Sequence, residues 1–157
     1  MISRTAEYAL RAVIVLGSSP ATPRTTQQIA EQTRVPSGYL SKVLQALGRA
    51  GLVEAQRGLY GGFVLSRSLD ELTILDVVNA VDPLERIDRC PLGIAAHDHR
   101  LCALHQRLDQ GIAQLEALFG GTTIGELLAE QEAGQPLCQK ESSGPAAIGP
   151  STSATNG

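Results

Sequence analysis

The chain has 157 residues with three cysteines, no tryptophan and a formal net charge of −3 at pH 7. Its two phenylalanines and three tyrosines are too few for the aromatic platforms on which proteins stack single-stranded nucleic acid, and an odd cysteine count argues against a disulfide framework. The sequence contains no run of about 18 apolar residues, the length that a membrane-spanning helix needs. The N-terminus predicts an amphipathic helix rather than a signal peptide, so we expect a cytoplasmic protein.

The charge is divided unevenly along the chain. Residues 1–68 contain eight Lys or Arg and three acidic residues, a net charge of +5, whereas residues 69–157 contain five basic and thirteen acidic residues, a net charge of −8. A basic half joined to an acidic half is typical of a nucleic-acid-binding module attached to another element. Because aromatic residues are scarce, the pattern favours double-stranded DNA read by a helix in the major groove.

The first predicted helix follows Ser3, which can cap it, and ends at Gly17. Its core face is expected to contain Ala6, Leu10, Val13 and Ile14. On the exposed side, Glu7 and Arg11 are four residues apart and are expected to form an ion pair.

The next two helices are predicted to form a helix-turn-helix. Thr25 followed by Gln28 is a capping box, and it begins a short helix that ends near Thr33. Pro36 prevents this helix from continuing, and Ser37 is expected to cap a second helix that runs to about residue 50. The apolar residues of that second helix recur at three- and four-residue steps and predict one buried stripe: Leu40, Val43, Leu44 and Leu47.

A two-stranded wing is expected after the second of these helices. Leu52–Gln56 and Phe63–Leu65 predict two strands, and the Gly-rich segment Arg57–Gly62 predicts the tip between them. Two helices joined by a tight turn and followed by such a hairpin are typical of a winged helix-turn-helix. The predicted fold class is therefore mainly α with a small β-wing.

The second half predicts an extended helical element. A short helix is expected over Thr73–Val81, and Leu84–Leu101 shows neither a helical nor a strand period. A long helix is then expected over Cys102–Phe119, with an apolar stripe formed by Leu104, Leu108, Ile112, Leu115 and Leu118. Because a winged helix already has a closed core, this stripe is expected to pack on the same helix of a second subunit, which predicts a homodimer.

The C-terminal end is predicted to contain one more ordered element. Thr123 with Glu126 can cap a last short helix, and the composition of residues 131–157 predicts a disordered tail. The expected organisation is a DNA-binding domain at 1–82, a Cys/His loop with a dimerisation helix at 83–130, and the tail at 131–157.

Cysteine and histidine residues gather around the start of the long helix. If Cys102 begins that helix, Cys102 and His105 lie one turn apart on one face, and Cys90 can fold back over them. Thiolate together with imidazole suits zinc or iron–sulfur chemistry. The spacing also allows Cys102 to be a small buried residue and His105 an exposed helix residue. For His97 and His99, in a polar loop, a solvated role is favoured.

Four motifs resemble those of the Rrf family of bacterial regulators, which includes the iron–sulfur cluster regulator IscR and the nitric-oxide sensor NsrR. They are SRTAEYALRA at 3–12, PSGYLSKVL at 36–44, RAGLV at 49–53 and RGLYGGF at 57–63. The likeness covers roughly residues 1–130 and implies a winged helix-turn-helix with a long C-terminal dimerisation helix.

The resemblance implies a homodimer on double-stranded DNA. The recognition helices would enter successive major grooves of a palindromic operator, about 34 Å apart, while the wing reaches a minor groove. The positions expected to contact DNA are Thr26, Ser37, Tyr39, Ser41, Lys42 and Gln45 near or on the recognition helix, with Arg57 and Tyr60 on the wing.

The resemblance also implies a [2Fe–2S] cluster. Cluster-binding relatives carry three cysteines before the long helix; Cys90 and Cys102 match the first and third, but Ala96 stands at the middle position. His105 matches the histidine ligand of the cluster regulator. Glu7 falls where nitric-oxide sensors present an acidic ligand from the partner's first helix, and His97 is an alternative fourth ligand.

Two regulatory functions are therefore predicted, and no enzymatic one. The first is a transcriptional repressor that senses redox state, nitric oxide or iron–sulfur status through the cluster. The alternative is a cluster-free winged-helix regulator that responds to zinc, thiol oxidation or a small ligand. An enzyme is not expected, because the sequence contains no third orienting group or nucleophile elbow beside the Cys/His residues.

Overall fold

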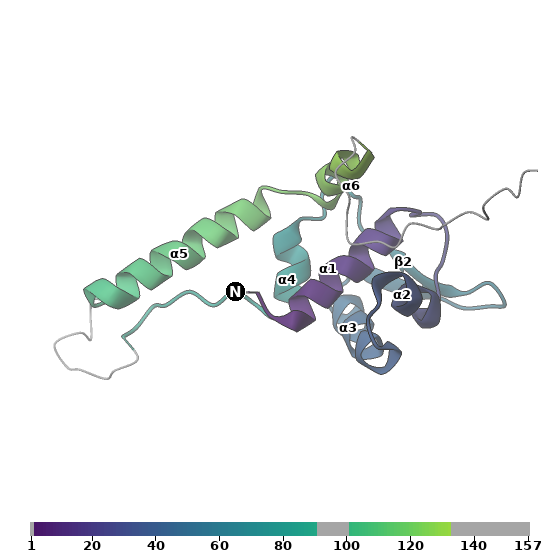
Figure 1. Cartoon of the computed structure of the whole chain (residues 1–157), viewed down its shortest axis with the longest axis horizontal. Helices are drawn as coiled ribbons and strands as arrows, with labels where there is room; N and C mark the ends of the chain where they lie inside the picture. The colour runs from purple at the N-terminus through teal and green to yellow at the C-terminus, as the bar shows by residue number, and fades with distance from the viewer. Residues whose placement is uncertain (1, 91–100, 133–157) are drawn as a thin grey trace, which may run out of the picture.

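The computed structural model describes residues 2–90 and 101–132, and this part of the chain forms six helices and one two-stranded antiparallel sheet (Figure 1). The helices are α1 (Arg4–Gly17), α2 (Thr26–Thr33), α3 (Ser37–Arg49), α4 (Ile74–Val81), α5 (Ala103–Gly120) and α6 (Ile124–Glu132), and the strands are β1 (Val53–Gln56) and β2 (Gly62–Leu65). The predicted class, mainly α with a small β-wing, is confirmed. None of the described helices is long and apolar enough to span a membrane.

Helix α1 is the centre of the core, and α2, α3, α4 and α6 all contact it (Figure 1). Ser3 caps it as predicted, since its hydroxyl oxygen accepts a hydrogen bond from the Ala6 N–H at 3.2 Å. The side chains of Ala6, Ala9 and Ala12 are completely buried; because they are small, the neighbouring helices can approach α1 closely. Leu10, predicted to lie in the core face, is only partly buried against it.

The helix-turn-helix forms as predicted except at one cap. Thr25 and Gln28 make the capping box, and α2 ends at Arg34 in the left-handed conformation, with φ of 58°. The prediction that Ser37 caps α3 is wrong: Pro36 is the cap, and its carbonyl accepts from the Tyr39 and Leu40 N–H groups at 3.0 and 2.9 Å. Ser37 is therefore already helical, and its hydroxyl cannot reach back over the first turn.

The wing is anchored at its base by Arg24, two residues before α2. Strand β1 pairs with β2 in the register Val53 to Leu65, close to the predicted strands. Arg24 adds a bridge to the outer side of β2, donating its N–H to the Phe63 carbonyl at 3.1 Å and accepting the Phe63 N–H at 2.8 Å. The wing therefore has a fixed direction relative to the helix-turn-helix.

Gly62 is required by this close approach of two backbones, because a Cβ atom there would lie 2.6 Å from the Arg24 backbone. We expect Gly62→Ala to push Arg24 away and to lower the free energy of unfolding by about 1–3 kcal/mol. Urea unfolding measures this, with Gly38→Ala as the control, since a Cβ at Gly38 meets nothing within 4 Å and should raise the stability by about 0.5–1 kcal/mol. Equal stability of Gly62→Ala and the wild type would contradict the Arg24 contact.

Helix α5 extends away from the body, and α6 returns to it (Figure 1). None of the residues of α5 is fully buried. Leu104, Leu108 and Leu118 of the predicted stripe are 62%, 50% and 62% exposed, whereas Ile112 and Leu115 are half-buried. A single copy of the chain thus leaves most of this stripe uncovered.

The second half matches the predicted elements apart from one boundary. Helix α6 is capped as predicted by Thr123 and Glu126 and packs the buried Ile124 into the core. It ends at Glu132 and so extends two residues into the predicted tail. The remainder of that tail, the alternative ligand His97, and Ala96 at the position of the missing cysteine lie outside the described residues.

Candidate nucleic-acid interface and Cys/His site

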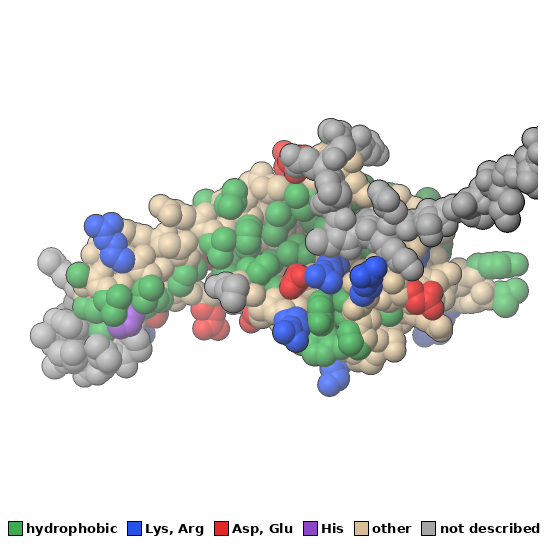
Figure 2. Space-filling model, viewed as in Figure 1, with side chains coloured by type: hydrophobic (Ala, Val, Ile, Leu, Met, Phe, Trp, Pro, Cys, Tyr) green, Lys and Arg blue, Asp and Glu red, His purple; other side chains and the backbone are tan. Residues whose placement is uncertain are grey.

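Helix α3 buries one face and presents a polar one. Leu40, Val43, Leu44 and Leu47 are buried as predicted, while the predicted DNA contacts on this helix are exposed: Ser37, Tyr39, Ser41, Lys42 and Gln45. Figure 2 shows several Lys and Arg side chains on the part of the body that contains α1–α3. Across the described residues, Lys42 and Gln45 have no hydrogen-bond or ion-pair partner within the chain, so both can reach a phosphate or a base edge.

Tyr39 is exposed, and its side chain also contacts two residues of α1. Its hydroxyl lies 2.6 Å from Thr5 Oγ1, and its ring meets the ring of Tyr8 edge-on with centroids 5.4 Å apart. No local pattern predicts this contact between residues 34 positions apart. Tyr39 therefore fixes α3 on α1, and 41% of Tyr39 remains exposed.

The wing tip presents three exposed side chains away from the body. Arg57 is exposed, and Leu59 and Tyr60 are 91% and 87% exposed. Gly58 has φ of 124°, a conformation that favours glycine and turns the chain at the tip. Thr26, predicted to contact DNA, is half-buried at the start of α2.

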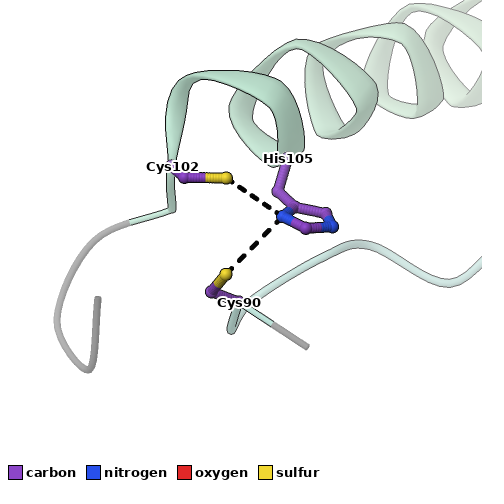
Figure 3. Close-up of side chains that lie close together, drawn as sticks. All are labelled: Cys90, Cys102 and His105. Atoms are coloured by element: carbon purple, nitrogen blue, oxygen red, sulfur yellow. Dashed lines mark hydrogen bonds between the residues drawn. The ribbon is translucent and has the colours of Figure 1, made fainter. Parts of the chain in front are cut away.

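The structure brings Cys90, Cys102 and His105 together (Figure 3). Cys102 Sγ lies 3.1 Å from His105 Nδ1, and Cys90 Sγ lies 3.6 Å from the same nitrogen. The three ligand atoms all lie within 4.8 Å of one another, and all three residues are half-buried. The predicted convergence of these residues is present, and their role as metal ligands stays a prediction.

Cys102 is the N-cap residue of α5, as the sequence predicted. At this position its sulfur faces backbone N–H groups of the first helical turn. The nearby backbone N–H of His105 is the main cause that lowers the pKa of Cys102 from its usual value, and Leu104 and Cys90 lower it further. Helix N-termini favour the thiolate in this way, which is the form that binds metals.

Glu7 does not join this group within one chain. Its carboxylate pairs with the Arg11 guanidinium, as predicted from their spacing. Arg11 also donates a hydrogen bond to the Thr33 carbonyl at 3.4 Å, at the end of α2. Glu7 is predicted to reach the metal site of the other subunit in a dimer, and that contribution stays a prediction.

Two residues without a signal in the sequence pattern, Arg86 and Asp109, fasten the segment before Cys90 to α5. The segment 83–90 runs along α5 (Figure 1), where Arg86 forms a double hydrogen bond with Asp109 and a weaker one with Glu116. The hydrogen bond from Arg86 is the main reason that the pKa of Asp109 falls to about 2. Asp109 stands one helical turn after His105, and only this spacing could have pointed to it.

The chain matches known proteins over most of its length. The Rrf2 family model, described as an iron-dependent transcriptional regulator, matches residues 2–130. A relative from Aquifex aeolicus (strain VF5), named as an HTH-type transcriptional regulator, is 27% identical over 135 residues, which cover 84% of this chain and 94% of the relative. These relatives regulate transcription and are not enzymes.

Two solved structures share the fold. CymR (YrzC), described as the global cysteine regulator of B. subtilis, has a TM-score of 0.69 at 23% identity and covers 83% of this chain and 97% of its own. T. potens IscR has a TM-score of 0.71 at 19% identity, and the match covers 87% of this chain and 93% of the IscR chain. Because the family model spans both the winged helix and α5, this chain belongs to the Rrf2 family of transcriptional regulators.

Proposed function

We propose that this chain is a homodimeric DNA-binding repressor whose operator affinity depends on a [2Fe–2S] cluster. Cys90, Cys102 and His105 would hold the cluster, with Glu7 of the partner subunit or His97 as the fourth ligand. The observation that carries the proposal is the convergence of two thiols and an imidazole at the first turn of α5.

The exposed face of α3 and the wing support DNA binding. Lys42 and Gln45 extend from α3 into solvent, and Arg57 extends from the wing, whose direction is fixed by the Arg24 bridge. A polar helix face flanked by a basic wing fits a helix in the major groove with the wing in the minor groove. The division of the chain into a DNA-binding part at 1–82 and a sensing and dimerisation part at 83–130 follows from this assignment.

Lys42→Ala and Arg57→Ala are each expected to weaken binding to double-stranded DNA. If each side chain contacts one phosphate, each variant lowers the dependence of log affinity on log salt by about one unit. Fluorescence anisotropy with a labelled duplex at several salt concentrations measures the slope. A change in preference at A·T-rich flanks in Arg57→Ala would place that side chain in the minor groove.

Arg89→Ala is the control for the loss of one positive charge, because Arg89 is 87% exposed in the segment along α5, outside the proposed interface. It should leave the salt slope unchanged. Unchanged slopes in Lys42→Ala and Arg57→Ala as well would show that the interface lies elsewhere.

The donor set of the Cys/His group fits an iron–sulfur cluster or zinc. Thiolate sulfurs bind both, and an imidazole ligand raises the reduction potential of a two-iron cluster relative to four thiolates. A bound cluster would supply a centre that changes its charge on reduction and reacts with nitric oxide. Cys90, Cys102 and His105 would supply three of the four protein ligands that a two-iron cluster or a tetrahedral zinc ion requires.

The position of this group couples it to DNA binding. Cys102 begins α5, and α5 is the helix on which a second subunit is expected to pack. A change in how the sulfur atoms of Cys90 and Cys102 are held would shift α5. The spacing of the two recognition helices would change with it, which is a coupling between two sites through a shared element.

A second candidate function is favoured by the distance between the two sulfur atoms, which lie within 4.8 Å of each other. In a metal-free protein, hydrogen peroxide could accept two electrons and two protons from the two thiols. The products are the Cys90–Cys102 disulfide and two water molecules. Mass spectrometry of peroxide-treated protein would show the loss of two hydrogens. Elemental analysis that finds no metal would favour this thiol-oxidation regulator over the cluster regulator, and zinc would favour a zinc-responsive one.

A further inference from the structure

We propose that Arg86 and Asp109 are positioning residues for the metal site: their ion pair fixes the segment 83–90 on α5 and thereby sets Cys90 against Cys102 and His105. The proposal rests on the proposed metal-binding function of this group. It adds two residues that do not touch the metal but decide whether its first ligand is in place.

The contact is a two-point fork. Arg86 Nε donates to Asp109 Oδ1 at 2.7 Å, and Arg86 Nη2 donates to Asp109 Oδ2 at 2.6 Å. A guanidinium and a carboxylate joined in this way fix direction as well as distance. A single charge pair between flexible side chains would not fix the register of the segment.

Two further hydrogen bonds extend the fork along the backbone and the helix. The Ile87 backbone N–H donates to Asp109 Oδ1 at 3.0 Å, so Asp109 holds the main chain of the segment as well as its arginine. Arg86 Nη1 also reaches Glu116 Oε2 at 3.4 Å, two turns farther along α5. Backbone and side-chain hydrogen bonds together thus fix the position of the segment along α5.

The fork and the metal ligands share one face of α5. His105 and Asp109 are four residues apart, and Glu116 follows seven residues after Asp109, which places all three side chains on the same side of a helix. Arg86 precedes Cys90 by four residues, so the segment passes the fork and then reaches the Cys/His group (Figures 1 and 3).

Apart from the fork, the described residues of the segment make few polar contacts. Between the fork and Cys90, Asp88 and Arg89 are 84% and 87% exposed and make only a 3.9 Å contact with each other. Before the fork, the Leu84 N–H donates to Asn79 Oδ1 at 3.1 Å. Beyond the fork, the Cys90 sulfur lies 3.6 Å from His105 Nδ1 and close to Cys102 Sγ, and these contacts are weaker than the two short charged hydrogen bonds of the fork. The Asp109 carboxylate is 17% exposed, so solvent competes for it less than at an open surface pair.

The test uses metal-free full-length protein titrated anaerobically with Co²⁺, whose absorption reports thiolate ligands. Arg86→Gln and Asp109→Asn each remove the fork. Arg89→Gln is the matched control for Arg86→Gln, because it removes the same positive charge at the residue next to Cys90. Both fork variants should bind Co²⁺ about ten- to a hundredfold more weakly, with an unchanged spectrum at saturation. Arg89→Gln should bind as the wild type does.

The double variant Arg86→Asp with Asp109→Arg restores opposite charges across the same gap. It should recover part of the lost affinity, whereas a general loss of folding would not be rescued; far-ultraviolet circular dichroism confirms the helix content of each variant. Wild-type Co²⁺ affinity in both Arg86→Gln and Asp109→Asn overturns the positioning role and leaves the proposed function intact.

If the wild type binds no Co²⁺, the metal-binding function fails, and the positioning role is then decided by disulfide formation. In peroxide-treated protein, the Cys90–Cys102 disulfide should form at least about tenfold more slowly in Arg86→Gln than in Arg89→Gln, because the fork raises the effective concentration of one thiol near the other. Equal rates overturn the proposal.

Discussion

Leu108→Glu combined with Leu118→Glu is expected to convert the protein to a monomer and to weaken operator binding by about a hundredfold or more. Both leucines lie on the stripe of α5 and are half or more exposed in the single chain, so a second copy is needed to bury them. Two linked recognition helices gain about 10²–10⁴ in affinity over one. Sedimentation measures the mass, and anisotropy with a two-half-site duplex measures the affinity.

Gln110→Glu is the matched control for these charges. Gln110 is an exposed residue of the same helix but lies outside the leucine stripe, so its substitution should leave the dimer and the affinity unchanged. A double-leucine variant that sediments as a dimer would show that the two subunits associate through another surface.

Cys102→Ser is expected to remove the metal centre. Serine has nearly the shape of cysteine and suits a helix N-cap, so the fold should be kept, but its hydroxyl is a poor ligand for the soft metals that thiolates bind. Iron and acid-labile sulfide in anaerobically purified protein should fall at least about tenfold, and the visible absorption should disappear. Operator affinity of this variant should no longer respond to chelators.

Cys138→Ser is the control for the loss of one thiol, because Cys138 falls in the predicted C-terminal tail and belongs to no predicted ligand set. Its iron content should match that of the wild type. Loss of iron in Cys138→Ser but not in Cys102→Ser would mean that the ligand set is misassigned.

Local patterns made most of the fold predictable. The capping boxes at Thr25 and Thr123 and the leucine spacing of α3 involve residues within one or two helical turns, so the sequence alone specifies them. The position of Cys102 at the start of α5 followed from the return of the apolar period. The family resemblance rested on the same helix-turn-helix and wing.

Contacts between distant segments could not be predicted in this way. The Tyr39–Thr5 hydrogen bond and the Arg24 bridge to Phe63 join residues that are adjacent only after folding. The Arg86–Asp109 fork joins an irregular segment to a helix, and an irregular segment has no period that shows which side chains face inward. The Ser37 cap failed for a different reason: Pro36 already fixes a backbone angle suited to helix initiation, which shifted the cap by one residue.

The dependence of DNA binding on the Cys/His centre is tested most directly by the duplex affinity of anaerobically purified protein, measured before and after removal of its metal under one salt condition. The account predicts coloured protein containing iron and sulfide, and an affinity that changes by about tenfold or more when both are removed. Colourless, metal-free protein that binds the operator as tightly as any treated sample would contradict it.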